Sequence, residues 1–187
     1  MTTHATPPGR FPYELTEPLS LVGLPGCGKS TVGKKLAAML QAPFVDVDSN
    51  VEVKQGASVA QIFAQSGEEE FRRLEREMIA YFLYEAKPMV LATGGGAFMC
   101  DETREILKEF TLTVWIKPPF DLVLERVSRR NTRPLLEGGD KRQKLIDLMN
   151  VRYPIYAEAE IIVETPAGSF EEAAKAIIDA LVRHGKP

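Results

Sequence analysis

Short, mostly apolar runs alternate along this chain with longer segments in which apolar residues recur at helical spacing. The apolar runs cover residues 19–22, 43–45, 89–92, 112–116 and 160–163. Runs of this length, separated by helical segments, are typical of parallel strands that are buried on both faces. The pattern therefore predicts an α/β fold in which helices cover both faces of a five-stranded parallel sheet.

Several helix starts are marked by a serine that is followed three residues later by Glu or Gln. In such a capping box, each of the two side chains satisfies a backbone N–H group at the start of the helix. The pairs are Ser58 with Gln61, Ser66 with Glu69, and Ser169 with Glu172. We expect a helix to begin at each pair, and a further helix near Ser30.

Prolines separate the beginning of the chain from the rest. Pro7, Pro8, Pro12 and Pro18 make residues 1–18 unsuited to a helix or a central strand, so we expect a loose extension there. The remaining residues, 19–187, show no internal repeat. They suffice for a single domain, because domains commonly hold ~100–200 residues.

The stretch GLPGCGKST, residues 23–31, follows the first predicted strand and precedes a helical segment. Its glycines let the backbone curl, so that successive N–H groups and the helix N-terminus form a cradle for phosphate. The glycines are Gly23, Gly26 and Gly28. Lys29 is placed to reach the β- and γ-phosphates, and the Ser30 hydroxyl to bind Mg²⁺. The alternative is a glycine-rich turn that happens to carry a lysine, but the order strand, loop, helix favours an ATP or GTP site.

Two aspartates follow the second predicted strand. Asp46 and Asp48 lie two residues apart, and on an extended backbone such residues share a face. Near a bound triphosphate, one carboxylate can hold Mg²⁺ through water while the other grips or deprotonates an acceptor hydroxyl. The alternative is that Asp48 or Ser49 only caps the next helix.

Three consecutive glycines, Gly94, Gly95 and Gly96, follow the third predicted strand. They leave the backbone bare, so a ligand can approach its N–H groups closely. The alternative is a tight turn that needs positive φ, which requires one or two glycines and not three. We therefore favour a surface that contacts substrate.

Adjacent arginines lie in the helical segment EEEFRRLEREM. Glu68 with Arg72, and Glu69 with Arg73, have the spacing of ion pairs on a solvated helix face. Adjacent helical residues point about 100° apart, so one arginine is free to face the site while the other faces solvent. The pattern alone does not say which.

Two segments in the last third of the chain add further arginines. SRRNTRPLLEGGD combines basic residues, proline and glycines, and we expect a mobile lid over about residues 129–140. Arg133 in that lid would close over the transferring phosphate. An exposed basic loop is the usual explanation of a lone arginine, but the flanking helices favour a hinged lid here. Arg152 ends a helical stretch before Pro154, and by itself it suggests a surface charge.

Composition excludes some classes of binding partner for this protein. A formal net charge of −3 offers no basic excess for binding a nucleic-acid backbone. No apolar run approaches the ~18 residues of a membrane span, and the N-terminal residues lack the pattern of a signal peptide. Cys27 and Cys100 are too few for a disulfide framework. We expect no nucleic-acid or membrane partner, and a cytoplasmic location.

Taken together, these motifs resemble the shikimate kinase family, in the nucleoside-monophosphate-kinase-like branch of the phosphate-loop (P-loop) fold. The resemblance covers about residues 19–183 and follows the order of the family's motifs. The motifs are GLPGCGKST, the DVD at residues 46–48, the EFRR at 70–73, the TGGGA at 93–97, the RPLL at 133–136 and the RYPIY at 152–156. It implies a three-layer P-loop kinase fold with a mobile lid.

The resemblance also implies the reaction: ATP phosphorylates the 3-hydroxyl of shikimate, in aromatic amino acid biosynthesis, with one Mg²⁺ per active site. It implies that Lys29, Asp48 and Arg133 are catalytic and that Ser30 and Asp46 hold the metal. The implied ATP-binding residues are Gly26, Cys27, Gly28, Lys29, Ser30, Thr31, Arg126 and Arg133, where Arg126 stacks on adenine unless Arg129 or Arg130 does. The implied shikimate-binding residues are Asp48, Arg72, Gly94, Gly95, Gly96 and Arg152.

Some points stay open at this stage. The resemblance leaves Asp48 as either a base or a group that only positions the hydroxyl. We expect a monomer. The alternative functions are another kinase of the same fold, for a nucleoside monophosphate or gluconate, and a nucleotide-binding module without catalysis.

Overall fold

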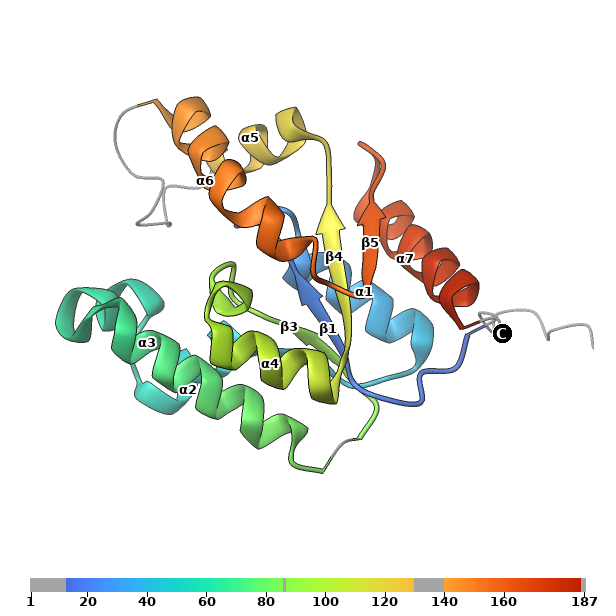
Figure 1. Ribbon diagram of the computed structural model, residues 1–187, viewed down its shortest axis with the longest axis horizontal. Coiled ribbons are helices and arrows are strands. Elements are labelled where there is room, and N and C mark those ends of the chain that lie inside the picture. Colours follow the sequence, from blue (N-terminus) through green and yellow to red (C-terminus); the bar gives the residue numbers. More distant parts are fainter. Residues whose placement is uncertain (1–12, 86, 130–139, 186–187) are drawn as a thin grey trace, which may run out of the picture.

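The computed structural model describes residues 13–85, 87–129 and 140–185. Its strands are β1 (Leu19–Val22), β2 (Phe44–Asp46), β3 (Val90–Ala92), β4 (Leu112–Lys117) and β5 (Ile161–Glu164). They form one parallel sheet in the order β2-β3-β1-β4-β5 (Figure 1). This confirms the predicted five-stranded parallel sheet, and each predicted strand boundary is met within one residue.

Helices lie on both faces of the sheet. They are α1 (Lys29–Leu40), α2 (Val47–Gln55), α3 (Val59–Leu83), the short 3₁₀ helix η1 (Ala97–Met99), α4 (Asp101–Phe110), α5 (Phe120–Arg129), α6 (Lys141–Tyr156) and α7 (Phe170–His184). Helices α1 and α7 pack against each other on one face, while α4 covers β4 on the other and contacts α3 (Figure 1). The predicted three-layer α/β architecture is confirmed.

The central strand β1 explains where the site lies. All four residues of β1 are buried, because β3 and β4 pair with its two edges and helices cover its faces. Its polar Ser20 is satisfied by a 2.7 Å hydrogen bond between its hydroxyl and that of Thr111. Ligands of open parallel sheets bind beyond the carboxyl ends of the strands, and the glycine-rich loop leaves β1 at that end.

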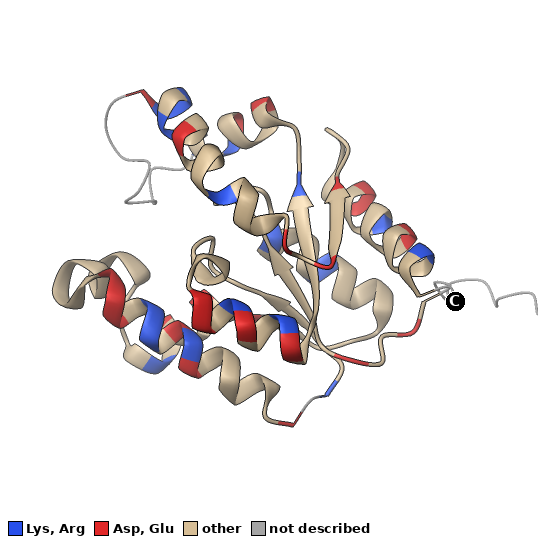
Figure 2. Cartoon of the chain, viewed as in Figure 1, with Lys and Arg blue, Asp and Glu red and all other residues tan. Residues whose placement is uncertain are grey.

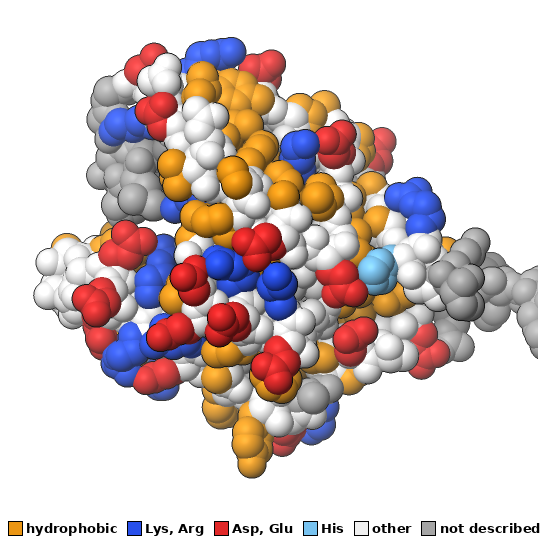
Figure 3. Space-filling model, viewed as in Figure 1, with side chains coloured by type: hydrophobic (Ala, Val, Ile, Leu, Met, Phe, Trp, Pro, Cys, Tyr) orange, Lys and Arg blue, Asp and Glu red, His pale blue; other side chains and the backbone are white. Residues whose placement is uncertain are grey.

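Charged residues concentrate on the outer faces of the helices. Acidic and basic side chains alternate along α3 and α4, where Figures 2 and 3 show both signs side by side. Within the part of the chain that the structure describes, none of the helices is both long and apolar enough to cross a bilayer.

One helix prediction is met and another needs correction. The span of α3 consists of two helices that meet at a kink at Gly67 (φ 81°, ψ 174°), so a helix does start next to Ser66, as expected. Helix α6 was expected to end at Arg152, but it continues through Pro154 to Tyr156. Pro154 has no N–H to bond the carbonyl four residues earlier, and only two residues of the helix follow it.

The capping boxes at Ser58 and Ser169 are confirmed, since in both the serine hydroxyl and the partner side chain bond the expected backbone N–H groups.

We predict that Ser169→Ala lowers the free energy of unfolding by about 1 kcal/mol, because one N–H at the start of α7 loses its acceptor. Denaturant unfolding followed by circular dichroism measures the change. Ser66→Ala is the control, and an equal loss there would contradict the assignment of the cap.

Candidate active site

The loop between β1 and α1 needs its glycines. Gly23, Gly26 and Gly28 adopt φ angles of 142°, 85° and 101°, which other residues rarely accept. A Cβ on Gly23 would also lie 2.8 Å from the carbonyl oxygen of Ile116 in the neighbouring strand. The curled conformation predicted for this loop is therefore confirmed, and it leads directly into the N-terminus of α1.

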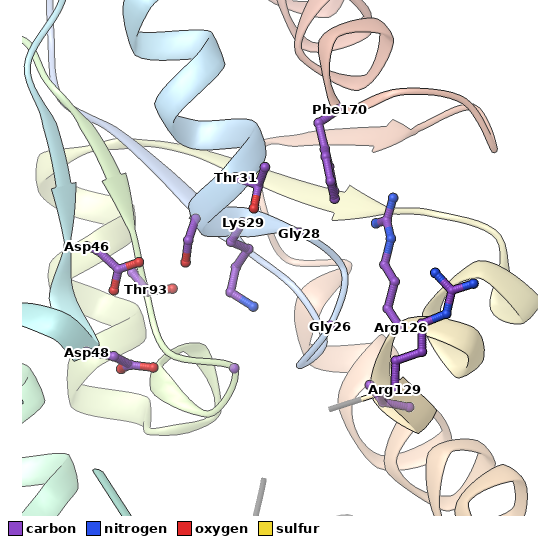
Figure 4. Close-up of a pocket in the computed structure, with 13 residues that line it drawn as sticks. Gly26, Gly28, Lys29, Thr31, Asp46, Asp48, Thr93, Arg126, Arg129 and Phe170 are labelled. Atoms are coloured by element: carbon purple, nitrogen blue, oxygen red, sulfur yellow. The ribbon is translucent and has the colours of Figure 1, made fainter. Parts of the chain in front are cut away.

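Lys29, the first residue of α1, folds back over the loop. Its Nζ donates hydrogen bonds to the carbonyl oxygens of Gly23 (2.7 Å) and Leu24 (3.0 Å), and only 8% of the residue is exposed. Figure 4 shows the ammonium group directed into the open space beside the loop. A phosphate in the loop would offer this cation oxygen acceptors that carry full negative charge.

A cavity of about 240 Å³ opens at this end of the sheet. It is lined by Gly26, Gly28, Lys29, Ser30, Thr31, Asp46, Asp48, Thr93, Gly95, Arg126, Val127, Arg129 and Phe170 (Figure 4). Hydroxyl, carboxylate, ammonium and guanidinium groups from four separate segments thus meet around one space. Such convergence of polar groups in a concave site is typical of a ligand site.

One end of the cavity carries a stacked pair. The guanidinium of Arg126 lies over the ring of Phe170 at 4.4 Å from its centroid, and its Nη1 donates to the carbonyl oxygen of Cys27 (3.3 Å). Arg129, the alternative to Arg126, also borders the cavity, but its side chain is 78% exposed and pairs with Glu125. The geometry therefore favours Arg126 as the flat surface on which a base can stack. Arg130, the other alternative, and Arg133 lie outside the described residues.

The two aspartates reach the cavity in a way that the sequence did not suggest. Asp46 ends β2 and is itself the cap of α2, since its Oδ1 accepts the backbone N–H of Ser49 at 3.2 Å. Asp48 lies in the first turn of α2 and not on an extended strand. The prediction that they share a strand face is therefore wrong, yet the tight strand-to-helix turn still brings both into the cavity (Figure 4).

A magnesium ion suits the residues at this edge of the cavity. The Ser30 hydroxyl and the Asp46 carboxylate both border it, and Mg²⁺ typically takes one or two protein oxygens together with phosphate oxygens and water. The described residues contain no group of three or more His, Cys, Asp or Glu side chains that would bind a metal without a nucleotide.

The run Gly94–Gly96 is packed tightly on several sides. A Cβ on Gly94 would lie 2.2 Å from Glu75 Oε1, one on Gly95 would lie 2.9 Å from the Pro25 ring, and one on Gly96 would lie 2.2 Å from Arg72 Nη2. None of these glycines adopts positive φ, so the tight-turn explanation is wrong. They are needed because charged side chains and the phosphate loop come too close for any side chain.

Arg72 is the arginine that turns inward. Its Nη1 lies 2.6 Å from Glu75 Oε2, and 15% of its side chain is exposed against 47% for Arg73. The predicted Glu68–Arg72 pair is present at 3.1 Å. The predicted Glu69–Arg73 pair is wrong, because Arg73 bonds instead to Glu70 and Glu77.

Glu75 joins Arg72 to the glycine run, and the sequence did not single it out. Its side chain is fully buried, and its Oε1 accepts the N–H of Gly94 at 3.1 Å. Burial raises the pKa of Glu75 to about 7, Arg72 opposes that rise, and the nearby Asp48 adds to it. Burial also disfavours the charge of Arg72, but its two acidic partners outweigh this and raise its pKa.

Arg152 approaches the glycine run from another element, α6. Only 7% of Arg152 is exposed, and its Nη1 donates to the carbonyl oxygen of Gly95 at 2.6 Å. The surface-charge interpretation of Arg152 is therefore wrong. Arg72 and Arg152, eighty residues apart in sequence, both contact residues 94–96.

The structure thus places the candidate residues in two neighbouring groups. Of those that it describes, Cys27, Arg72, Gly94, Gly96 and Arg152 do not line the cavity itself. They lie against residues that do, chiefly Gly95. Sequence reasoning did not single out Thr93, Glu75 and Phe170. A threonine just after a strand, a glutamate in the middle of a charged helix and a phenylalanine at a helix start carry no distinguishing pattern.

We predict that the ionisation of Glu75 makes stability depend on pH. The folded protein holds this proton more tightly than the unfolded chain, whose carboxyl titrates near the ordinary value of 4.5. The unfolding free energy of the wild type should therefore fall, relative to Glu75→Gln, as pH rises from about 4.5 to about 7, by about 2–3 kcal/mol in total.

Urea titrations of both proteins across this range measure the difference. The slope of this difference against pH is diagnostic, because Gln at position 75 does not titrate, so that any change in packing shifts the difference by a constant amount. Glu77→Gln, an exposed carboxylate of the same helix, is the control and should run parallel to the wild type. A difference between wild type and Glu75→Gln that does not change with pH would contradict the prediction.

Comparison with known proteins gives the site a family. The family model described as shikimate kinase matches residues 25–182. Shikimate kinases of Brucella canis and Caulobacter vibrioides are 47% and 48% identical to the chain, over 88% and 86% of its length and 82% and 80% of theirs. A solved shikimate kinase from Acinetobacter baumannii in complex with shikimate is 37% identical, with a TM-score of 0.87, 93% of this chain covered and 97% of that one. The chain therefore belongs to the shikimate kinase family.

Proposed function

We propose that this site transfers the γ-phosphoryl group of ATP to the 3-hydroxyl of shikimate, giving shikimate 3-phosphate and ADP. Shikimate kinase activity follows from the family. The observation that carries the choice of acceptor is the pair of inward-facing arginines, Arg72 and Arg152, which meet at the glycine run beside the phosphate loop. A sugar-like acceptor with a single carboxylate suits two guanidinium groups at one point.

The nucleotide occupies the cavity with its phosphates in the loop. Backbone N–H groups of Gly26 and Gly28 face the β-phosphate, and Lys29 moves from the loop carbonyls to the β- and γ-phosphate oxygens. The N–H of Cys27, which is also assigned to the nucleotide, bonds the carbonyl oxygen of Leu24 at 3.2 Å and would have to leave it. The remaining assigned ligands of the phosphates and the metal are Ser30, Thr31 and Asp46. Bound Mg²⁺ would supply a positive charge that offsets the charge developing on the phosphates.

The adenine lies at the end of the cavity where Arg126 and Phe170 are stacked. A purine can lie against the guanidinium plane or the ring without a large rearrangement, since both already border the cavity. Arg133 would close over the γ-phosphate from a lid at about residues 129–140. The structure describes only Arg129 and Asp140 of that segment, so the lid stays a prediction.

The acceptor carboxylate binds between Arg72 and Arg152. Glu68, whose side chain is 52% exposed, is the partner that Arg72 can give up to the substrate, while the buried Glu75 keeps the guanidinium in place. Gly94–Gly96 form the surface under the ring. Asp48 accepts a hydrogen bond from the reacting hydroxyl and receives its proton as the new P–O bond forms. Because the transition state is loose, this proton transfer is required only late in the reaction.

Of the loose extension expected at residues 1–18, residues 1–12 lie outside the described part of the chain, and residues 13–18 are not loose, because Leu15 is buried in the core and the carbonyl oxygen of Pro18 accepts the N–H of Leu112 at 2.8 Å. We also propose three sequence-based expectations about the whole protein, namely one catalytic domain at 19–187, a monomer and a cytoplasmic location. They rest on composition and motif order alone.

An ADP-release assay with a panel of acceptors tests the proposed function. Shikimate, quinate, gluconate, AMP and CMP are compared at equal concentrations with ATP and Mg²⁺. Turnover should be high with shikimate and low with the nucleotides and gluconate. Preference for a nucleotide or for gluconate would replace the acceptor assignment, and ATP binding without any turnover would favour a non-catalytic module.

We predict that Lys29→Met lowers kcat about 10²- to 10³-fold while the protein stays folded. The variant loses one preorganised cation at the transferring phosphoryl group, which corresponds to ~3–4 kcal/mol of transition-state stabilisation. Steady-state kinetics and circular dichroism measure the two quantities. Near-normal turnover of the variant would remove Lys29 from the mechanism.

We predict that Arg72→Ala and Arg152→Ala each lower kcat/KM for shikimate about 10- to 150-fold, while the KM for ATP changes much less. Each deletes charge-assisted hydrogen bonds worth ~1.5–3 kcal/mol. The measurement is initial-rate kinetics with each substrate varied in turn.

Arg73→Ala is the matched control, because Arg73 is adjacent in sequence, carries the same charge and faces solvent. It should change shikimate kinetics less than twofold, as exposed ion pairs contribute only ~0–1 kcal/mol. Arg72→Lys and Arg152→Lys should remain impaired, since an ammonium cannot form two parallel hydrogen bonds. Equal effects at positions 72, 73 and 152 would indicate a general charge effect and not a carboxylate site.

A further inference from the structure

Tyr156 is a buried polar residue that the proposed reaction does not use. It ends α6, none of its surface is exposed, and its ring lies near Phe98 and Trp115, with centroids 6.5 and 5.8 Å away. Its hydroxyl donates a hydrogen bond to the carbonyl oxygen of Gly95. This hydrogen bond joins Tyr156, on the helix that also carries Arg152, to Gly95, which borders the cavity.

The same carbonyl oxygen receives a second donor. Arg152 Nη1 lies 2.6 Å from Gly95 O, and Arg152 precedes Tyr156 by one helical turn, so that both side chains project from one face of α6. A carbonyl oxygen has two lone pairs and can therefore accept both bonds. The far side of Gly95 lies against the Pro25 ring, so the peptide has little room to turn.

The shared acceptor matters when a substrate binds. When the Arg152 guanidinium forms two parallel hydrogen bonds to the substrate carboxylate, its nitrogens turn away from the Gly95 carbonyl oxygen. If Arg152 were the only donor, the part-buried carbonyl of Gly95 would lose its hydrogen bond to the protein at that moment, which carries a penalty. With Tyr156 in place, the carbonyl stays satisfied.

We propose that Tyr156 is a positioning residue for the acceptor: its hydroxyl holds the Gly95 carbonyl and thereby frees Arg152 to bind the substrate carboxylate. The inference rests on the proposed function, in which Arg152 binds that carboxylate. It assigns to the final tyrosine of the RYPIY segment a role in acceptor affinity, through a neighbour and without contact to the substrate.

The state of the hydroxyl supports this role. Burial raises the pKa of Tyr156 to about 12, although the nearby Arg152 opposes the rise. The group therefore keeps its proton, and remains a donor, throughout the pH range in which the enzyme would be assayed.

The first experiment is Tyr156→Phe, which keeps the ring and removes only the donor. We expect the KM for shikimate to rise about 5- to 50-fold, with kcat changed less than about threefold and the KM for ATP less than about twofold. Tyr153→Phe is the matched control, since Tyr153 lies on the same helix and its ring also packs on Trp115, with centroids 4.8 Å apart. It should leave all three constants unchanged.

A double-mutant cycle separates positioning from general loosening. In an Arg152→Ala background no guanidinium leaves the carbonyl, so adding Tyr156→Phe should not weaken shikimate binding further, as measured by calorimetric titration. Replacing Tyr156 by 4-aminophenylalanine, which restores a donor at the same place, should recover most of the affinity.

Several results would overturn the proposal. Three of them are an unchanged KM for shikimate in Tyr156→Phe, equal rises in KM for shikimate and ATP, and full additivity with Arg152→Ala in shikimate binding. The fourth is a Tyr156→Phe variant too unstable to assay, because a single hydrogen bond lost beneath an intact ring should not prevent folding. The wild type distinguishes this failure from that of the proposed function. If it phosphorylates shikimate and Tyr156→Phe matches it, only the role of Tyr156 fails, whereas a wild type without shikimate turnover refutes the proposed function itself.

Discussion

The close packing of side chains on the backbone of residues 94–96 is the constraint on which the acceptor side of this site depends. Glu75, Arg72 and Pro25 each come within a distance that a Cβ would forbid, and Arg152 and Tyr156 share one carbonyl oxygen. Elements far apart in the chain, namely the phosphate loop, α3 and α6, are thereby fixed relative to one another. The charged groups of the acceptor side are thus positioned by contacts with the bare backbone of Gly94–Gly96.

Burying charge at this point has an energetic consequence. Glu75 is fully enclosed, and Arg72 and the N–H of Gly94 compensate its charge only in part, since its pKa remains raised. Such an arrangement contributes little to stability and more to geometry, because a paired buried carboxylate holds its partner in one orientation. Asp48, which also lines the cavity, is close enough to add to this rise in the pKa of Glu75.

Local sequence patterns predicted those parts of the molecule that local physics decides. The strands follow from apolar runs, the phosphate loop from glycines that need positive φ, and the starts of α3 and α7 from capping boxes. Other features depend on contacts that no local pattern contains. Arg152 looks like a surface charge until Gly95 is brought to it, and Asp48 looks extended because nothing in the sequence shows that α2 begins directly at Val47.

The aromatic cluster beside α6 has an optical consequence. Trp115 is the only tryptophan of the chain, it is buried, and its ring lies within 5.8 Å of those of Tyr153 and Tyr156. Its emission therefore originates from a single place, next to the helix that carries Arg152. Excited tyrosines at this range pass their energy to the indole efficiently, so the protein contains a fluorophore that reports on the packing behind its acceptor site without any label.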